Sequence, residues 1–284
     1  MAVKPRITIV GAGKFGTAIA LSLRAAGYEI GSIVARSRGE SLAKARRLAA
    51  RVGAHASSDL SETPEQLVWF CVPDSQIAQA ARSAAKHGWA GKMALHSSGA
   101  LTSDELGRLR AVGASVASVH PMMTFIEGSH PSLQGVPFAI EGDVAAVKVA
   151  RRIVRGLGGK AYAIRKEDKA AYHAWGTFIS PLLTSLLATS EEVASLAGVK
   201  RQAAARRMIP ILQKTLANYA RFGAARGLSG PIVRGDVETV RQHLRVLRRS
   251  RAIREVYSSL VRASLEFLPS KNRKQIKRAL DSAD

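Results

Sequence analysis

A glycine-rich turn between a strand and a helix is the feature that most constrains this fold. The apolar run Arg6 to Val10 predicts a buried strand, the sequence Gly-Ala-Gly-Lys-Phe-Gly follows at residues 11–16, and residues 17–24 have helical apolar spacing. In such a unit the three glycines permit a tight turn, a close approach to a pyrophosphate and close helix packing. The predicted dinucleotide-binding residues here are Gly11, Gly13, Lys14, Phe15 and Gly16. The alternative is a glycine-rich turn without a ligand.

The end of the second predicted strand, residues 29–35, indicates which dinucleotide is bound. An NAD site usually has an acidic residue there, for the ribose hydroxyls. This chain has Arg36, Ser37 and Arg38 instead. Guanidinium groups pair well with phosphate oxygens, so the sequence favours NADP, with its 2′-phosphate, over NAD. The alternative is a solvated basic turn in an arginine-rich protein.

Composition excludes several classes of protein. The 284 residues are 46% hydrophobic, which favours a folded globule of two domains over a disordered chain. The single cysteine, Cys71, excludes an intramolecular disulfide and multi-cysteine metal sites, and its apolar surroundings predict a small buried hydrophobe. We expect no metal, no membrane span and a cytoplasmic location. The net charge of +22 favours phosphates, acidic substrates or nucleic acid as partners without defining a fold.

Strand and helix patterns alternate along the first 164 residues. Further strands are predicted at 67–72, 92–96, 115–119, 136–140 and 161–164, and helices at 39–52, 75–87, 103–110 and 143–155. This alternation predicts an α/β, doubly wound, mainly parallel Rossmann sheet. Helical patterns alone follow, at 169–196, 200–226, 235–247 and 251–267, and Pro210 should start, kink or split a helix. We therefore expect an NAD(P)-binding domain at 1–164 and an all-helical substrate or dimerisation domain at 165–284.

Ligands of open parallel sheets bind beyond the carboxyl ends of the strands. This rule selects Val72 and Pro73 for the cofactor ribose and nicotinamide, and Ser97 and Ser98 for cofactor or substrate, although such residues are also ordinary in turns. His96 and His120 end strands too. Each is a candidate proton donor, but a histidine that caps backbone groups is the favoured interpretation for either one alone.

A polar cluster opens the helical part of the chain. Lys169, His173, Thr177 and Ser180 recur at helical spacing, so they share one face, near Lys166 and Tyr172. Such a face is suited to bind a carboxylate and supply a proton, with His173 as donor or orienting group and Lys169 as anion-binding partner. A solvent-facing stripe is the alternative. The bond between Ser180 and Pro181 marks a local break.

A second cluster, residues 230–236, reads Gly-Pro-Ile-Val-Arg-Gly-Asp between two helical segments. Arg234 is a candidate clamp for a substrate carboxylate, and Asp236 a residue that orients Arg234 or caps the next helix. An ordinary surface arginine is the alternative for Arg234.

These motifs together resemble the Rossmann-like, DUF2520-type proteins of the wider 6-phosphogluconate dehydrogenase, ketopantoate reductase and pyrroline-5-carboxylate reductase superfamily. The resemblance runs through nearly the whole chain, and its most specific parts are Tyr172-His173-Ala174 and residues 230–236. It implies a nicotinamide-binding domain, a helical domain that often forms dimers and an active site between them. Where the family tends to carry Asn, this chain has Ser180, whose hydroxyl is shorter, so carry-over of that position is in doubt.

The sequence therefore predicts an NADP-dependent oxidoreductase that transfers a hydride to a C=O or C=N group of a small carboxylate-bearing substrate, and a homodimer. Ketopantoate-reductase-like activity is the most concrete version, with His173, Lys169, Arg234 and Ser180 as catalytic residues. The alternative is a non-catalytic, NADP-sensing or nucleic-acid-associated Rossmann protein, supported by the basic residues between Arg241 and Arg278. The two basic runs in it, 241–254 and 271–278, contain no aromatic stacking residue, so solvated helix faces are favoured there.

Overall fold

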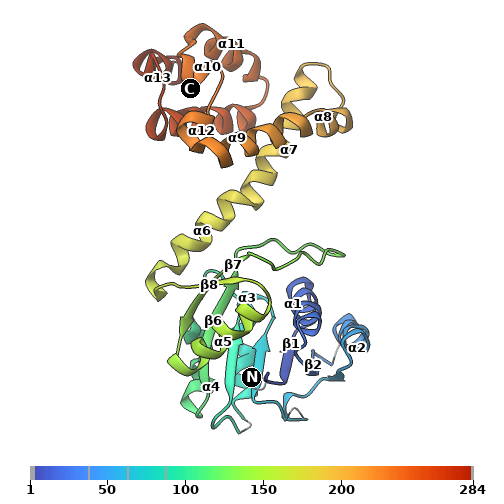
Figure 1. Ribbon diagram of the computed structural model, residues 1–284. Coiled ribbons are helices and arrows are strands. Elements are labelled where there is room, and N and C mark those ends of the chain that lie inside the picture. Colours follow the sequence, from blue (N-terminus) through green and yellow to red (C-terminus); the bar gives the residue numbers. More distant parts are fainter. Residues whose placement is uncertain (1–3, 38, 63, 87, 283–284) are drawn as a thin grey trace. The chain divides into compact units, whose positions relative to one another are not determined.

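The computed structural model describes residues 4–37, 39–62, 64–86 and 88–282 (Figure 1). Their packing divides the chain into two compact units, Met1–Ser180 and Pro181–Asp284. The sequence placed the boundary after residue 164. In the structure the short helical turn η3 (Lys166–Asp168) and helix α6 (Lys169–Ile179) lie in the first unit. The polar cluster at the start of α6 therefore belongs with the sheet.

The first unit contains an eight-stranded sheet in the order β3-β2-β1-β4-β5-β6-β7-β8. Neighbouring strands are parallel except for the antiparallel pair β6 and β7. The strands are β1 (Ile7–Val10), β2 (Ile30–Val34), β3 (His55–Ser57), β4 (Leu67–Phe70), β5 (Met93–His96), β6 (Ser115–Pro121), β7 (Pro137–Gly142) and β8 (Lys160–Ala163). The predicted doubly wound, mainly parallel sheet is confirmed.

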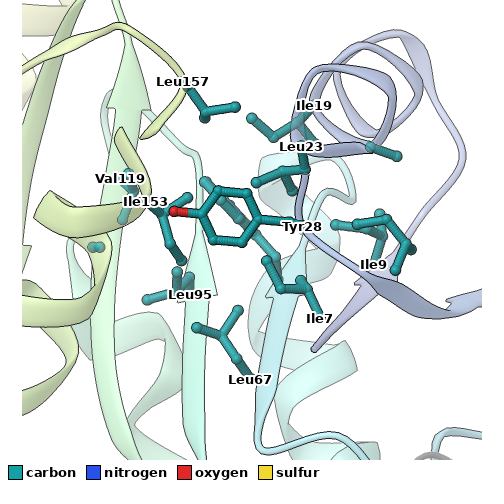
Figure 2. Packing of buried hydrophobic residues seen from close by; sticks show 14 of the residues in the cluster. Ile7, Ile9, Ile19, Leu23, Tyr28, Leu67, Leu95, Val119, Ile153 and Leu157 are labelled. Carbon is teal, nitrogen blue, oxygen red and sulfur yellow. The ribbon is translucent and has the colours of Figure 1, made fainter. Parts of the chain in front are cut away.

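Alternate residues of a strand point to opposite sides of the sheet, and every residue of β1, β2 and β4 is buried, so both faces of the sheet are covered at these strands. Ile7 and Ile9 of β1 pack with Ile19 and Leu23 of α1 (Lys14–Ala25), in the cluster shown in Figure 2. The same cluster includes Tyr28 and Ile153, the latter from α5 (Val144–Gly156). On the other face, residues of β4 and β5 pack against α3 (Asp74–Ala84) and α4 (Gly107–Ala111). Helices cover both faces, which leaves the strand ends for ligands.

The first unit also contains helix α2 (Glu40–Val52) and the short helical turns η1 (Leu60–Glu62) and η2 (Ser103–Leu106). The second unit is helical throughout its described residues. Its helices are α7 (Pro181–Leu196), α8 (Arg201–Arg207), α9 (Ile209–Gly227), α10 (Pro231–Arg234), α11 (Val237–Leu247), α12 (Arg251–Phe267) and α13 (Arg273–Asp281). Val240, Val261 and Ile276 belong to a separate core that joins α11, α12 and α13.

The predicted helix breaks are present. Ser180 separates α6 from α7, with φ −127° and ψ −82°, and Pro210 lies in the first turn of α9, where proline is tolerated. The sequence analysis missed β3, α10 and α13. Ile276 and Leu280 of α13 are fully buried, so part of the basic segment is a packed helix.

Within the described residues, no single helix is long and apolar enough to span a membrane. The bent helix pair 166–196 and 201–234 together has the length and composition of a span, by these two criteria alone.

Candidate functional site

The glycine-rich turn has the geometry that a dinucleotide requires. Gly11 has φ +105°, and a Cβ there would lie 2.7 Å from the carbonyl oxygen of Cys71, while a Cβ at Gly16 would overlap the carbonyl oxygen of Gly11. At Gly13 a Cβ would meet nothing within 4 Å, so the backbone there faces open space at the start of α1. Gly11 and Gly16 thus maintain a tight turn, and Gly13 exposes the helix amino terminus to an anion.

A cavity of about 660 Å³ lies beside this turn, between α2 and α3. Of the predicted cofactor residues it is lined by Gly11, Gly13, Arg36, Val72 and Pro73. Ser41 and Lys44 also line it, and sequence reasoning missed both. They lie one helical turn apart on α2, and this i, i+3 spacing just after the Arg36 turn is the signal that could have found them. The cavity thus has a basic end with a hydroxyl, which is suited to a phosphate.

The other predicted cofactor residues that the structure describes lie outside the cavity lining. Phe15 packs edge-on against Trp69 and Phe125, with ring centroids 6.4 and 5.2 Å apart. Ser97 Oγ accepts a 2.8 Å hydrogen bond from the indole of Trp69. Lys14 is exposed in the first turn of α1, and Ser37 is exposed in the turn after β2. Arg38 lies outside the described residues. Cys71 is partly buried against the core, and burial raises the pKa of its thiol, which is typical of an inert packing residue.

A polar network occupies the ends of β5 and β6. Ser98 donates from Oγ to Asp74 Oδ2 over 2.6 Å, and its carbonyl oxygen accepts from Ser118 Oγ and Lys169 Nζ at 3.2 and 3.0 Å. Lys169 Nζ also donates to Ser118 Oγ over 2.8 Å. Burial lowers the pKa of Lys169 to about 8, although Glu141 and Asp74 oppose the shift. The network links α3, β5, β6 and α6 around one buried cation.

Both ring nitrogens of His96 form hydrogen bonds with backbone groups. Its Nε2 lies 2.9 Å from the carbonyl oxygen of Thr102, and its Nδ1 accepts from the Ser98 amide at 3.1 Å. These partners require a neutral ring with the proton on Nε2. Burial, opposed by the Thr102 hydrogen bond, lowers its pKa to about 4. The capping interpretation of His96 is confirmed by these contacts.

Two imidazoles meet at Gly99, directly after β5. A Cβ at residue 99 would lie 2.5 Å from His173 Cδ2 and 2.8 Å from His120 Nε2, so only glycine fits between these rings. The ring centroids of His120 and His173 are 6.1 Å apart. His120 is half-buried and its Nδ1 lies 3.0 Å from the Tyr172 hydroxyl, whereas His173 is exposed. The sequence did not anticipate the His120–Tyr172 pair, whose members are 52 residues apart.

The shared helical face predicted for α6 is only partly an open surface. His173 is exposed, but Lys169 is fully buried, and its Nζ already has two protein acceptors. This corrects the expected direct anion-binding role of Lys169, because an anion on the surface would not contact its ammonium. Thr177 donates from Oγ1 to the carbonyl oxygen of His173, and Lys166 pairs with Asp104 at 2.6 Å. Ser180 ends the helix.

In the second unit, Arg234 is held by Asp236. Arg234 Nε donates to Asp236 Oδ2 over 2.9 Å, while the Arg234 side chain remains 62% exposed. Asp236 precedes α11 without a side-chain capping bond, so it orients the arginine rather than capping the helix with its carboxylate. Asn272 braces the turn by donating from Nδ2 to the carbonyl oxygen of Gly235 over 2.9 Å.

Comparisons with known proteins agree with this architecture. Residues 2–121 match the Rossmann-like domain family, and residues 136–264 match the family described as Domain of unknown function (DUF2520). The two matches follow one another along the chain, in the order that the resemblance implied. No match was found among curated proteins.

Several solved structures share the fold over nearly the whole chain. Protein TM1727 from Thermotoga maritima is 24% identical with a TM-score of 0.71, covering 97% of this chain and 98% of that one. A reductive aminase from Aspergillus terreus, in complex with NADPH and ethyl-5-oxohexanoate, is 18% identical with a TM-score of 0.65, covering 93% and 94%. A pyrroline-5-carboxylate reductase from Coxiella burnetii is 15% identical with a TM-score of 0.59, covering 99% and 98%. At these identities the likeness establishes the fold alone.

Proposed function

We propose that this protein is an NADP-dependent oxidoreductase that transfers a hydride to a C=O or C=N group of a small, carboxylate-bearing substrate. The observation that carries the proposal is the cavity that runs from the open Gly13 backbone to the basic group of Arg36 and Lys44. A pyrophosphate and a 2′-phosphate are the two anionic parts of NADP, and the cavity offers each a suitable partner.

Different residues bind the different parts of NADP. The Gly11–Gly13 turn and the α1 amino terminus hold the pyrophosphate, Arg36, Ser41 and Lys44 hold the 2′-phosphate, and Val72 and Pro73 contact the ribose and nicotinamide side. When bound, NADPH supplies the hydride. The buried cation of Lys169 acts as a positioning residue, because it fixes the Ser98 carbonyl and Ser118 beside Gly99.

Substrate contacts are assigned to His173, Arg234 and Ser180. His173 is exposed beside Gly99, where its ring can orient a substrate or donate a proton. Arg234 presents a guanidinium oriented by Asp236, which suits a forked pairing with a carboxylate. Ser180 offers a hydroxyl at the end of α6.

Ketopantoate-reductase-like reduction is one specific form of this reaction, and imine reduction is another. The named relatives favour the imine, because one is a reductive aminase and another a reductase of pyrroline-5-carboxylate, a cyclic imine that carries a carboxylate. Cyclic imino acids are therefore the first substrates to screen, followed by 2-keto acids.

The proposal includes a homodimer. Helices α7 and α9 bury no residue of their own, and they expose Leu182, Ile211, Leu216 and Tyr219 by 45%, 67%, 60% and 61%. A group of apolar side chains as exposed as this is typical of a surface that is buried against a partner. In a symmetric dimer the same helices of a second copy would bury it. Light scattering on the purified protein should give twice the mass of the chain, whereas a monomer at micromolar concentration would refute the dimer.

The basic surface supports a second candidate, a nucleic-acid-associated protein without turnover. On α13, Arg273, Lys274, Lys277 and Arg278 are all exposed, whereas Ile276 is buried. Binding through such a surface weakens steeply with salt.

One titration distinguishes the two candidates. NADPH and NADH are added in parallel, at moderate salt, while nicotinamide fluorescence is followed. Tight binding of NADPH with a clear preference over NADH supports the enzyme, and Arg234→Ala and His173→Ala should then abolish turnover with NADPH binding intact. Equal, weak binding that disappears with salt refutes the NADP site and favours the nucleic-acid candidate.

A further inference from the structure

The two ring nitrogens of His120 have different surroundings. Nδ1 lies 3.0 Å from the Tyr172 hydroxyl, with the two rings edge-on at 5.4 Å. Nε2 is directed to Gly99, and within the described part of the chain it forms no hydrogen bond. One nitrogen is thus held by the protein, while the other remains available for a ligand beside the exposed ring of His173.

Tyr172 lies on the side of His120 that faces away from Gly99. It is only 8% exposed on α6, and it lies next to Tyr162 of β8, with ring centroids 6.3 Å apart. Tyr162 is itself half-buried, on β8 at the edge of the sheet. The order from Gly99 outward is therefore His120, Tyr172 and Tyr162.

We propose that His120 is the proton donor of the reaction and that Tyr172 returns a proton to it in the same step. This inference rests on the proposed reduction. As the hydride adds to the substrate carbon, the Nε2–H bond of His120 breaks and an O–H or N–H bond forms on the substrate. At the same time the Tyr172 O–H bond breaks and an Nδ1–H bond forms. Tyr172 regains a proton from water by way of its neighbour Tyr162, which leaves hydroxide, so the ring changes tautomer without becoming charged. After product release, proton exchange with water returns the ring to the Nε2–H tautomer.

The electrostatics favour this concerted transfer over a stepwise one. Burial, together with Lys169, His173 and His96, lowers the pKa of His120 to about 4, so an imidazolium is costly. Burial raises the pKa of Tyr172, so a lasting tyrosinate is costly too. A proton that enters at Nδ1 as another leaves from Nε2 avoids both charged forms. His173 then has the orienting role.

The tautomer of His120 tests the relay without substrate or cofactor. In 15N-labelled protein at pH 7, the ring-nitrogen shifts of His120 should report a neutral ring with the proton on Nε2. Tyr172→Phe should transfer at least part of the population to the Nδ1–H tautomer, because the donor to Nδ1 is lost. A wild-type ring protonated on Nδ1, or a ring in Tyr172→Phe unchanged from wild type, would overturn the proposal.

The chain supplies a matched control. His243 Nδ1 lies 3.0 Å from the Tyr257 hydroxyl, with the rings edge-on at 5.8 Å, in the second unit. Tyr257→Phe should change the tautomer of His243 and leave that of His120 as in wild type. A shift of His120 in this variant would show that the response to Tyr172→Phe is not local, which would also count against the relay.

Kinetics provide the second readout once a substrate is found. Tyr172→Phe should lower kcat by about 100-fold, the scale of general acid catalysis, with the NADPH Kd unchanged. Rates in mixtures of H2O and D2O should depend on deuterium content along a curve for wild type and along a straight line for Tyr172→Phe, because several protons move only in the intact relay. A straight line for wild type would overturn the proposal. Failure to bind NADPH would instead refute the proposed function and leave the tautomer result standing.

Discussion

Lys169 donates a hydrogen bond from Nζ to Ser118 Oγ over 2.8 Å, in a place where both side chains are buried. The same ammonium donates to the carbonyl oxygen of Ser98. Both acceptors are neutral, and the nearest carboxylates, Glu141 and Asp74, act only through space. The protein thus keeps a desolvated cation beside His96 and His120, and this cation lowers the pKa of both rings.

Replacement of Lys169 by Met should change how stability depends on alkaline pH. Burial lowers the Lys169 pKa from 10.5 to about 8, so between these values the unfolded chain binds more protons than the folded one. The contribution of Lys169 to the free energy of unfolding should therefore rise with pH from 8 to 10.5, by at most about 3 kcal/mol, and the buried Cys71 thiol, whose pKa is raised, opposes it above pH 9. Urea unfolding at several pH values measures this slope. In Lys169→Met the rise should disappear, and an equal rise in both proteins would contradict the assignment.

The acid side of the stability curve should depend on His96. Burial lowers its pKa from 6.5 to about 4, so the unfolded chain gains a proton first as the pH falls. The stabilisation is complete above pH 6.5 and is lost towards pH 4, by up to about 3 kcal/mol. His96→Gln should be less stable than wild type at pH 7 and flatter in this window. His55→Gln, at an exposed ring on β3, is the control and should reproduce the wild-type curve.

The features that the sequence predicted depend on local patterns. The strand, glycine and helix order at residues 6–24 is local, and so is the alternation that defines the sheet, because apolar periodicity is a property of neighbouring residues. His96 forms hydrogen bonds with backbone groups, as a histidine at the end of a strand ordinarily does. The three residues of β3 are too few for a period to show, and α13 is dominated by its basic face, which concealed the buried Ile276 and Leu280.

The contacts that the sequence did not reveal are long-range. Helical spacing placed Lys169 and His173 on one polar face, but only the packing of α6 against β6 shows that Lys169 is directed inward to Ser118. The pairing of His120 with Tyr172 likewise depends on the register of β6 and the rotation of α6 about its axis. Neither quantity is encoded in a single stretch of sequence, so the polar residues were found but their partners were not.

Gly31 should be intolerant of even a methyl group. A Cβ there would overlap the carboxylate of Glu65 and lie 2.5 Å from Arg6 Nε, and Glu65 is fixed by a 2.7 Å hydrogen bond from Thr8. Gly31→Ala should lower the free energy of unfolding by about 1–3 kcal/mol, the usual cost of overpacking. Gly107→Ala is the control, because a Cβ at this helical position meets nothing within 4 Å. The two variants should differ in urea midpoint, and equal midpoints would contradict the steric argument.

Arg36 and Lys44 should decide the choice between NADPH and NADH. Both line the basic end of the cavity, and each charge-assisted contact with the 2′-phosphate is worth about 1.5–3 kcal/mol. Arg36→Ala and Lys44→Ala should therefore weaken NADPH binding by about 10- to 100-fold and leave the weaker NADH binding nearly unchanged. Arg51→Ala is the matched control, since Arg51 is an exposed cation on the same helix α2 but lies outside the cavity lining. Fluorescence titration of the three variants measures these affinities. A parallel loss for both dinucleotides would place the 2′-phosphate elsewhere, and an equal loss in Arg51→Ala would attribute the effect to net charge alone.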